Sequence, residues 1–167
     1  MPVSNSSPLI HLSKLGKLGY AKRVYEFIVI PPAVRVETIE RGKLDGYTDA
    51  SILEELEREG WLKTIKLSSA FSRLADKLSD IVGEGESEAI ALAVEQDERL
   101  FIDDLKGRRV AELHGIETTT TLGVIFELLA KGALAKTDYV RNVRNYGSQG
   151  WISGEIIEEF VRRGEDL

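Results

Sequence analysis

Cysteine is missing from this chain of 167 residues, and histidine occurs only twice. Without cysteine the protein has no disulfide framework and no thiolate chemistry. His11 and His114 are far apart and lack the spacing of a zinc site, so we do not expect histidine-based nucleophilic catalysis. No apolar run reaches membrane-spanning length, and the first residues lack the charged and apolar regions of a signal peptide. We therefore expect a soluble, cytoplasmic protein.

The composition, 43% hydrophobic and 30% charged, suits one compact α/β domain over residues 1–167, with 133–167 as a C-terminal helical extension. A net charge of −6 disfavours indiscriminate binding of nucleic acid. The charge is uneven, because residues 1–25 hold four basic residues and no acid, and residues 131–144 hold four basic residues and one acid. A polyanion could bind these basic strips beside an acidic pocket, and the alternative interpretation is that they are solvated helix faces.

Strand-like and helix-like segments alternate along the chain without a linker or an internal repeat. This alternation predicts a three-layer α/β/α sandwich around a mainly parallel sheet of about five strands. Ser7 is a good N-cap and Pro8 suits the first position of the first helix. We expect strands over 2–5, 27–30, 62–67, 100–102 and 116–119, and helices over 9–18, 31–40, 50–59, 72–80, 86–96, 107–114, 122–130, 138–146 and 153–163.

Two adjacent carboxylates, Asp103 and Asp104, follow the apolar run 100–102. At the carboxyl end of a parallel strand, they would face the crevice where such sheets carry functional groups. Their mutual repulsion would require a divalent metal or nearby basic groups such as Lys106, Arg108 and Arg109. A second interpretation is an ordinary helix start, where free amides and the helix dipole favour negative charge.

Other polar groups are expected at the same edge of the sheet. The segments 5–7 and 119–121 follow the first and fifth strands, so their side chains would meet the aspartate pair. Glu86 follows Gly85 at the opening of a buried helix, where glycine permits close approach of backbone or ligand. Glu37 lies in the helix after Pro31-Pro32. Either glutamate could instead be a surface or first-turn residue.

Four motifs in this order resemble the PIN-domain superfamily. They are Val-Ser-Asn-Ser-Ser-Pro-Leu-Ile at 3–10, Ile-Pro-Pro-Ala-Val-Arg-Val-Glu at 30–37, Gly-Glu-Ser-Glu-Ala-Ile at 85–90, and Ile-Asp-Asp at 102–104 followed by Arg108 and Ala111. Thr-Leu-Gly at 121–123 also matches, so the resemblance runs from residue 2 to about residue 132. It is closest to a prokaryotic nucleic-acid-binding branch related to VapC-like toxins of type II toxin–antitoxin pairs.

The resemblance implies an α/β/α fold whose acids hold Mg²⁺ or Mn²⁺ and whose active members cut single-stranded RNA. Hard divalent cations prefer oxygen ligands, which agrees with these residue types. The implied functional residues fall into three sets. The metal would be held by Asn5, Glu37, Glu86 and Asp104; the catalytic acids would be Glu37, Glu86, Asp103 and Asp104; and the substrate would be bound by Ser7, Lys106 and Arg108.

Asn5 departs from the family pattern, which has an acid at the end of the first strand. Asparagine keeps an oxygen ligand but lacks the charge and cannot act as a base. The sequence therefore supports two functions: a metal-dependent ribonuclease, as the toxin of a pair with an antitoxin protein, or an attenuated module that binds RNA or a protein without cleavage. A phospho-acceptor receiver domain fits less well, because receivers place paired acids near the first strand. The apolar helices over 86–96 and 122–130 suggest more apolar surface than one domain buries, and hence a homodimer.

Overall fold

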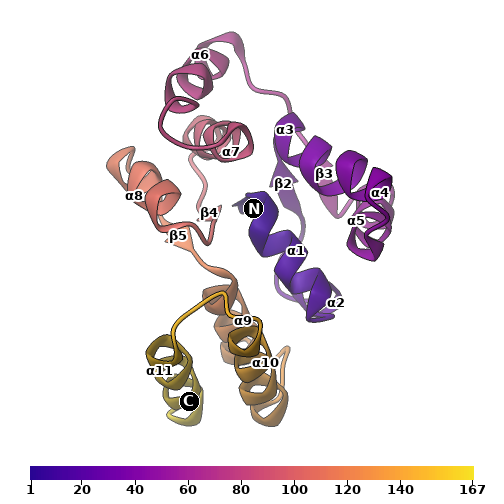
Figure 1. Ribbon diagram of the computed structural model, residues 1–167, viewed down its shortest axis with the longest axis vertical. Helices are drawn as coiled ribbons and strands as arrows, with labels where there is room; N and C mark the ends of the chain where they lie inside the picture. Colours follow the sequence, from indigo (N-terminus) through magenta and orange to yellow (C-terminus); the bar gives the residue numbers. More distant parts are fainter.

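The computed structural model describes residues 1–167 and contains one five-stranded sheet whose strands are all parallel. The strand order is β3-β2-β1-β4-β5, so the first strand lies at the centre (Figure 1). This confirms the predicted α/β/α fold and its parallel sheet. The strands are short: β1 is Val3–Ser4, β2 Ile28–Ile30, β3 Leu62–Thr64, β4 Leu100–Phe101 and β5 Thr118–Thr119.

The strands form where the sequence concentrates β-branched and aromatic residues that can be buried on both faces. Every residue of β1, β2 and β4 is buried. The helices connect these strands and cover the sheet (Figure 1). They are α1 (Ser6–Lys14), α2 (Leu18–Ala21), α3 (Pro32–Arg35), the π-helix η1 (Val36–Arg41), α4 (Gly42–Leu44), α5 (Thr48–Arg58), α6 (Ser69–Leu78), α7 (Glu84–Gln96), α8 (Leu105–Leu113), α9 (Thr121–Ala130), α10 (Lys136–Ser148) and α11 (Gly154–Glu165).

The first helix differs from the sequence prediction at both ends. It begins at Ser6 with Asn5 as its N-cap, so the prediction of Ser7 as the cap is wrong. Pro8 is the third residue of the helix, where a missing N–H is still tolerated because the first turn lacks partners. The helix ends at Lys14, since Gly16 has a φ of +66° and turns the chain before α2.

The apolar helices α7 and α9 are covered by their own chain. The five consecutive apolar residues from Ala89 to Ala93 are fully buried, and so are Val124, Ile125 and Leu128 of α9. The expectation that these helices carry more apolar surface than one protomer buries is therefore wrong. A homodimer stays a prediction, without this argument in its favour.

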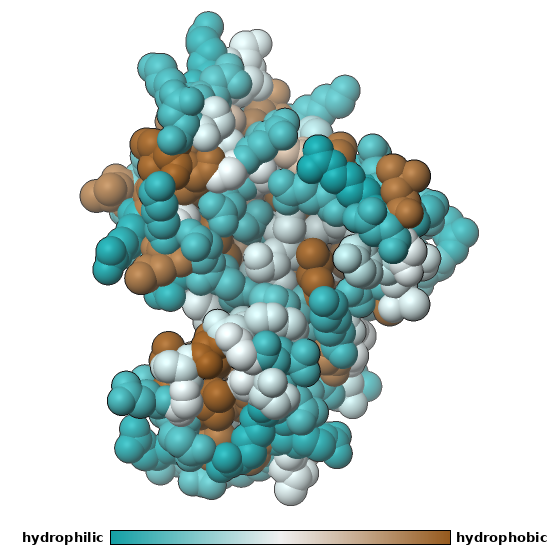
Figure 2. All heavy atoms as spheres, viewed as in Figure 1, coloured by the Kyte–Doolittle hydropathy of each residue, from teal (hydrophilic) through white to brown (hydrophobic).

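The C-terminal helices α10 and α11 pack on each other and on α9 (Figure 1). The Tyr139 hydroxyl donates to the carbonyl oxygen of Phe160 at 2.7 Å, and Gly164 lets α11 lie directly against the tyrosine ring. Tyr139 and Val161 belong to the same hydrophobic cluster as the residues of the sheet. The division into one domain with a C-terminal helical extension stays a prediction. Figure 2 shows hydrophobic residues gathered on the surface of this helical pair. No helix has the length and apolar character needed to cross a membrane.

Candidate functional site

The carboxyl ends of the three neighbouring strands β1, β4 and β5 carry the polar residues that the sequence placed at one edge. The backbone N–H of Asn5 donates to the carbonyl oxygen of Phe101 at 2.9 Å, and that of Ile102 donates to Thr119 at 2.9 Å. These hydrogen bonds hold the ends of the strands side by side. The structure thus brings Asn5, the aspartate pair and Thr120 to the same edge of the sheet.

Glu37 reaches this edge from the π-helix η1, which continues α3 after β2. Single turns of π-helix are rare and are often found at functional sites, because the wider turn changes where a side chain points. The Ser6 hydroxyl, at the start of α1, donates a hydrogen bond to Glu37 Oε2. This contact orients the Glu37 carboxylate beside the end of β1. The neighbouring Ser7, which was predicted to bind substrate, does not make this contact.

Glu86 lies on α7, and a hydrogen bond joins this helix to α3, which η1 and Glu37 follow. Glu88 Oε2 accepts a hydrogen bond from the backbone N–H of Ala33 at 2.8 Å, which satisfies an amide in the first turn of α3. A Cβ added to Gly85 would lie 2.6 Å from both carboxylate oxygens of Glu37. The glycine is therefore required for Glu37 to pack against the start of α7, as its conformational role in the sequence suggested.

Two neighbouring acids act on the pKa of Glu86. Burial raises the pKa of this carboxyl group, the negative charge of Asp104 raises it further, and Glu37 adds a smaller effect in the same direction. A backbone hydrogen bond at Gly83 and the positive charge of Lys106 oppose the shift. Glu37 and Asp104 thus both act electrostatically on Glu86, and these three carboxylates are called the acidic cluster below. Acids with a shifted pKa often mark functional sites.

Because the folded state raises the pKa of Glu86, it binds more protons than the unfolded state above the ordinary value of 4.5. The free energy of unfolding should therefore fall as pH rises from about 4.5 to the raised value. We expect Glu86→Gln to remove this loss and to raise Tm by a few degrees near neutral pH. Thermal unfolding between pH 4 and pH 8 in chelator measures the effect, with the exposed Glu84→Gln as control. Parallel wild-type and Glu86→Gln curves would contradict the assignment.

The two adjacent aspartates have different partners. Asp103 accepts from the backbone N–H and the hydroxyl of Thr121, each at 2.7 Å, and contacts His11 Nδ1 at 2.9 Å. Asp104 Oδ1 accepts from the N–H of Gly107 at 2.8 Å and caps α8. The helix-start interpretation is therefore correct for Asp104, and its second oxygen is free for the acidic cluster. Asp103 instead ties α1 to α9.

His11 is a residue that sequence reasoning missed. Its ring stacks on Trp151 with centroids 3.9 Å apart, and its Nδ1 lies 3.3 Å from the Tyr146 hydroxyl. Burial and the charge of Asp103 raise the pKa of Tyr146, which keeps its hydroxyl protonated. His11 therefore connects Asp103 to the C-terminal helices. The only available signal was its place one helical turn beyond the polar segment 5–7, which does not identify a partner.

The oxygen donors at this edge are of the type that a divalent cation prefers. Asn5 is 3% exposed and its Oδ1 has no hydrogen-bond partner, a costly arrangement that a bound cation would relieve. Carboxylate and amide oxygens are the ligands that Mg²⁺ and Mn²⁺ prefer. No three histidine or acidic side chains are grouped closely enough to hold a metal as they stand. The ligand set fits in chemistry, and binding requires the carboxylates to move together.

The predicted substrate-binding residues lie around the acidic cluster. Lys106 is exposed on the first turn of α8, and its charge acts on Glu86. Arg108 forms none of the ion pairs of the molecule, and its Nε is buried without a hydrogen-bond partner. Arg108 therefore forms no ion pair with either aspartate, although it was predicted as one of the basic groups that could offset their repulsion. The guanidinium group remains available to a ligand.

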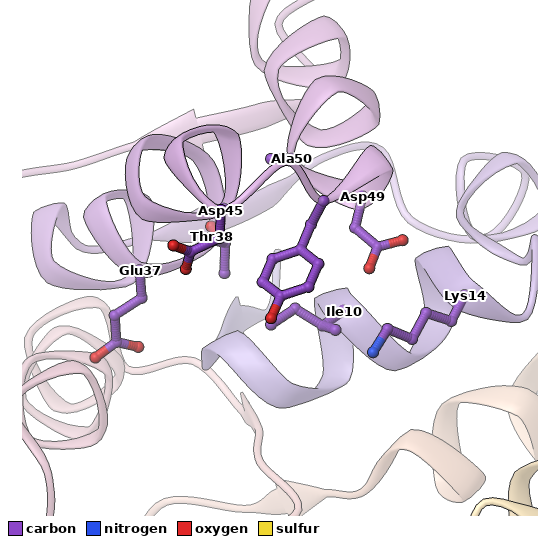
Figure 3. A pocket seen from close by; sticks show the side chains of 9 residues that line it. Ile10, Lys14, Glu37, Thr38, Asp45, Asp49 and Ala50 are labelled. Carbon is purple, nitrogen blue, oxygen red and sulfur yellow. The ribbon is translucent and has the colours of Figure 1, made fainter.

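An acid-lined pocket of about 250 Å³ opens beside Glu37, between α1, η1, α4 and α5. Figure 3 shows Glu37 at one end of this pocket and Lys14 at the other. Asp45 and Asp49 also line it. With three acids against one lysine, Lys14, its lining disfavours a phosphate chain.

Gly85→Ala should disturb the candidate site without destabilising the fold. The added methyl group would displace the flexible end of Glu37, while alanine favours the helix over glycine by about 1 kcal/mol. We expect unchanged or higher Tm and at least a tenfold loss of any activity that depends on Glu37. Activity and thermal unfolding are measured together, with Gly19→Ala as the control because its Cβ would meet nothing within 4 Å. Full activity in Gly85→Ala would show that Glu37 placement is unimportant.

The family model DUF3368, a PIN domain, matches residues 1–166, which include every strand and every helix of the structure. No curated protein matches the chain.

Proposed function

Because the chain belongs to the PIN-domain family, we propose that it is a metal-dependent ribonuclease acting on single-stranded RNA. PIN domains are generally of nuclease type and use divalent metal ions. The observation that supports the proposal most is the acidic cluster of Glu37, Glu86 and Asp104 at the carboxyl edge of the sheet. The buried, unpartnered Oδ1 of Asn5 adds an oxygen donor at the same edge.

We propose Glu37, Glu86, Asp104 and Asn5 as the residues that hold Mg²⁺ or Mn²⁺. A cation at this place would supply an activated water and neutralise charge that develops on the scissile phosphate. Ser6 orients Glu37 through its hydroxyl, and the cap of α8 fixes Asp104. Ser7, Lys106 and Arg108 would bind the phosphates of the strand, Arg108 by charge-assisted hydrogen bonds.

Asp103 contributes differently in this proposal. Its Oδ1 accepts from the backbone N–H of Thr121, and its Oδ2 accepts from the Thr121 hydroxyl and contacts His11 Nδ1. It would therefore support the site by holding α1 and α9 at the ends of β1 and β5. The catalytic role predicted for Asp103 stays a prediction, and its contacts favour a positioning role.

The proposal is tested with the full-length protein and a 5′-labelled single-stranded RNA of mixed sequence. We expect cleavage with Mn²⁺ or Mg²⁺, none in EDTA, and little cleavage of the same sequence as a duplex. Cleavage that persists in EDTA would reject metal dependence. Equal cleavage of duplex and single strand would reject the proposed substrate.

We further propose that the protein is the toxin of a type II toxin–antitoxin pair. The proposal rests on the resemblance of its motifs to that branch, and it implies an antitoxin protein as partner. Expression in a bacterial host should arrest growth, and Asp104→Asn should relieve the arrest at equal protein level. Arrest by both forms would reject a toxic nuclease activity.

Asn5 favours a second candidate, an attenuated PIN module that binds RNA or a protein without cutting it. An amide supplies an oxygen but no charge, so it attracts a divalent cation less strongly than a carboxylate does. This candidate predicts RNA binding without turnover in the cleavage assay above. It is rejected if wild-type protein cleaves RNA and the Asn5→Asp variant cleaves no faster.

A further inference from the structure

A second pocket, of about 350 Å³, lies next to the acidic cluster and shares only Asp103 and Arg108 with the residues given a role in the proposed function. It opens between the first turn of α8, the start of α9 and the C-terminal helices. Its lining is mostly hydrophobic, with Leu105, Leu122, Trp151, Ile156 and Phe160 among the residues. A volume in this range suits a small planar group.

The pocket adjoins the edge of the sheet where the acids meet. Asp103 and Thr120, from the ends of β4 and β5, form part of its lining. Asp104 is the next residue along the chain, and Arg108 lies one helical turn beyond it on α8. A strand of RNA with a phosphate at Asp104 would therefore place a neighbouring nucleotide at the mouth of the pocket.

The aromatic wall of the pocket is held rigidly. Trp151 stacks on His11, and Tyr146 packs edge-on against Trp151 with centroids 5.0 Å apart. His11 is in turn fixed by Asp103, at 2.9 Å. A wall ordered in advance loses little conformational entropy when a ligand packs against it. Such a surface is suited to a flat aromatic ligand.

One cationic group distinguishes this pocket from a purely apolar groove. Arg108 lines it, makes no ion pair, and has a buried Nε with no hydrogen-bond partner. An apolar side chain of a protein would leave that N–H unsatisfied, at a cost in free energy. The carbonyl or ring nitrogen of a base, or the phosphate beside it, would satisfy it.

We propose that this pocket binds one unstacked base of the RNA strand, next to the scissile phosphate, and so contributes to the choice of cleavage site. Single-stranded RNA is commonly recognised in this way, by bases splayed onto aromatic side chains and arginine. The inference rests on the proposed ribonuclease function. It assigns the C-terminal helices, through Trp151, Ile156 and Phe160, to substrate recognition.

The test measures binding of a fluorescent single-stranded RNA by anisotropy, in the Glu86→Gln background so that cleavage does not interfere. The RNA is compared with versions that carry one abasic ribose at successive positions. Ile156→Trp would fill the pocket from its rim, and Glu159→Trp is the matched control because it is exposed on the same helix and lines none of the described pockets. Leu105→Trp fills the pocket from α8 and replaces Ile156→Trp if that variant fails to fold.

We expect one abasic position to weaken binding about tenfold, the effect of losing one stacked base. Ile156→Trp should weaken binding of the intact RNA by a similar factor and abolish the effect of the abasic position, whereas Glu159→Trp should bind like the parent. Equal binding of every abasic RNA, or equal binding by both tryptophan variants, would overturn the inference and leave the pocket to a protein partner.

The experiments distinguish a failure of the ribonuclease proposal from a failure of the base-pocket proposal. If wild-type protein fails to cleave RNA but shows the abasic effect, the pocket is supported and the nuclease proposal is rejected. If it cleaves RNA in Mn²⁺ at sites unaffected by an abasic ribose, the nuclease is supported and the base pocket is rejected.

Discussion

Asp104→Asn should lower Mn²⁺-dependent RNA cleavage by at least about 100-fold without unfolding the protein. Losing a partner of a metal ligand typically costs 10–100-fold in metal affinity or activity, so loss of a ligand charge should cost more. The substitution removes the charge and keeps the helix cap, since asparagine caps helices as well as aspartate does. Asp104→Ala would remove both and would confuse a catalytic loss with a weakened α8.

The measurement pairs initial cleavage rates with calorimetric titration of Mn²⁺. Wild-type protein should bind Mn²⁺, and Asp104→Asn should bind it far more weakly while its Tm in EDTA stays the same or rises. Asp49→Asn is the matched control, because it removes an acid from the neighbouring pocket and not from the acidic cluster. Equal cleavage by wild type and Asp104→Asn would reject the metal site and the nuclease mechanism together.

Asn5→Asp should destabilise the protein in the absence of metal and raise its affinity for Mn²⁺. Asn5 is buried, and the residue after it donates to Glu37. A carboxylate at this position would be removed from water, and the negative charge of Glu37 lies nearby, so we expect the free energy of unfolding in chelator to fall by about 1–3 kcal/mol. With Mn²⁺ the added charge contacts a divalent cation, and affinity should rise at least about tenfold.

Thermal unfolding in EDTA and in Mn²⁺, together with cleavage rates, tests this prediction. If the natural site is attenuated, Asn5→Asp gains nuclease activity along with metal affinity. If the natural site is already competent, metal affinity rises and cleavage changes little. Asn142→Asp is the control for a buried asparagine elsewhere, since Asn142 is 4% exposed and lies on α10, and it should lose stability without gaining a response to Mn²⁺. An equal response of both variants would place Asn5 outside the metal site.

The sequence predicted the parallel sheet and the edge that carries the candidate site, because both follow from local patterns. A run such as Phe27–Ile30 marks a buried strand, and polar residues at strand ends follow from the topology. Gly85 at the start of the buried helix α7 correctly indicated close packing, and the group packed against it is the Glu37 carboxylate. These features depend on residues close together in the chain.

The parts that sequence reasoning missed depend on contacts between distant segments. Nothing near His11 indicates that it meets Asp103, 92 residues later, or stacks on Trp151. The choice of Ser6 over Ser7 as the partner of Glu37 depends on where α1 begins, and helix ends are hard to place within one or two residues. The π-turn at Val36–Arg41 has no sequence signature that we recognised, although it sets the direction of Glu37.

The central position of β1 has a consequence for how the protein is assembled. Its two neighbours, β2 and β4, belong to different halves of the chain, and each half contributes two of the four proposed ligands. Asn5 and Glu37 come with the first half, and Glu86 and Asp104 with the second. The pairing of Ser4 with Phe101 closes a long loop, a slow step in folding because its entropy cost precedes its contacts. A chain still emerging from the ribosome, before β4 and Asp104 have been made, therefore lacks the fourth proposed ligand, so the proposed metal site cannot assemble until synthesis has passed residue 104.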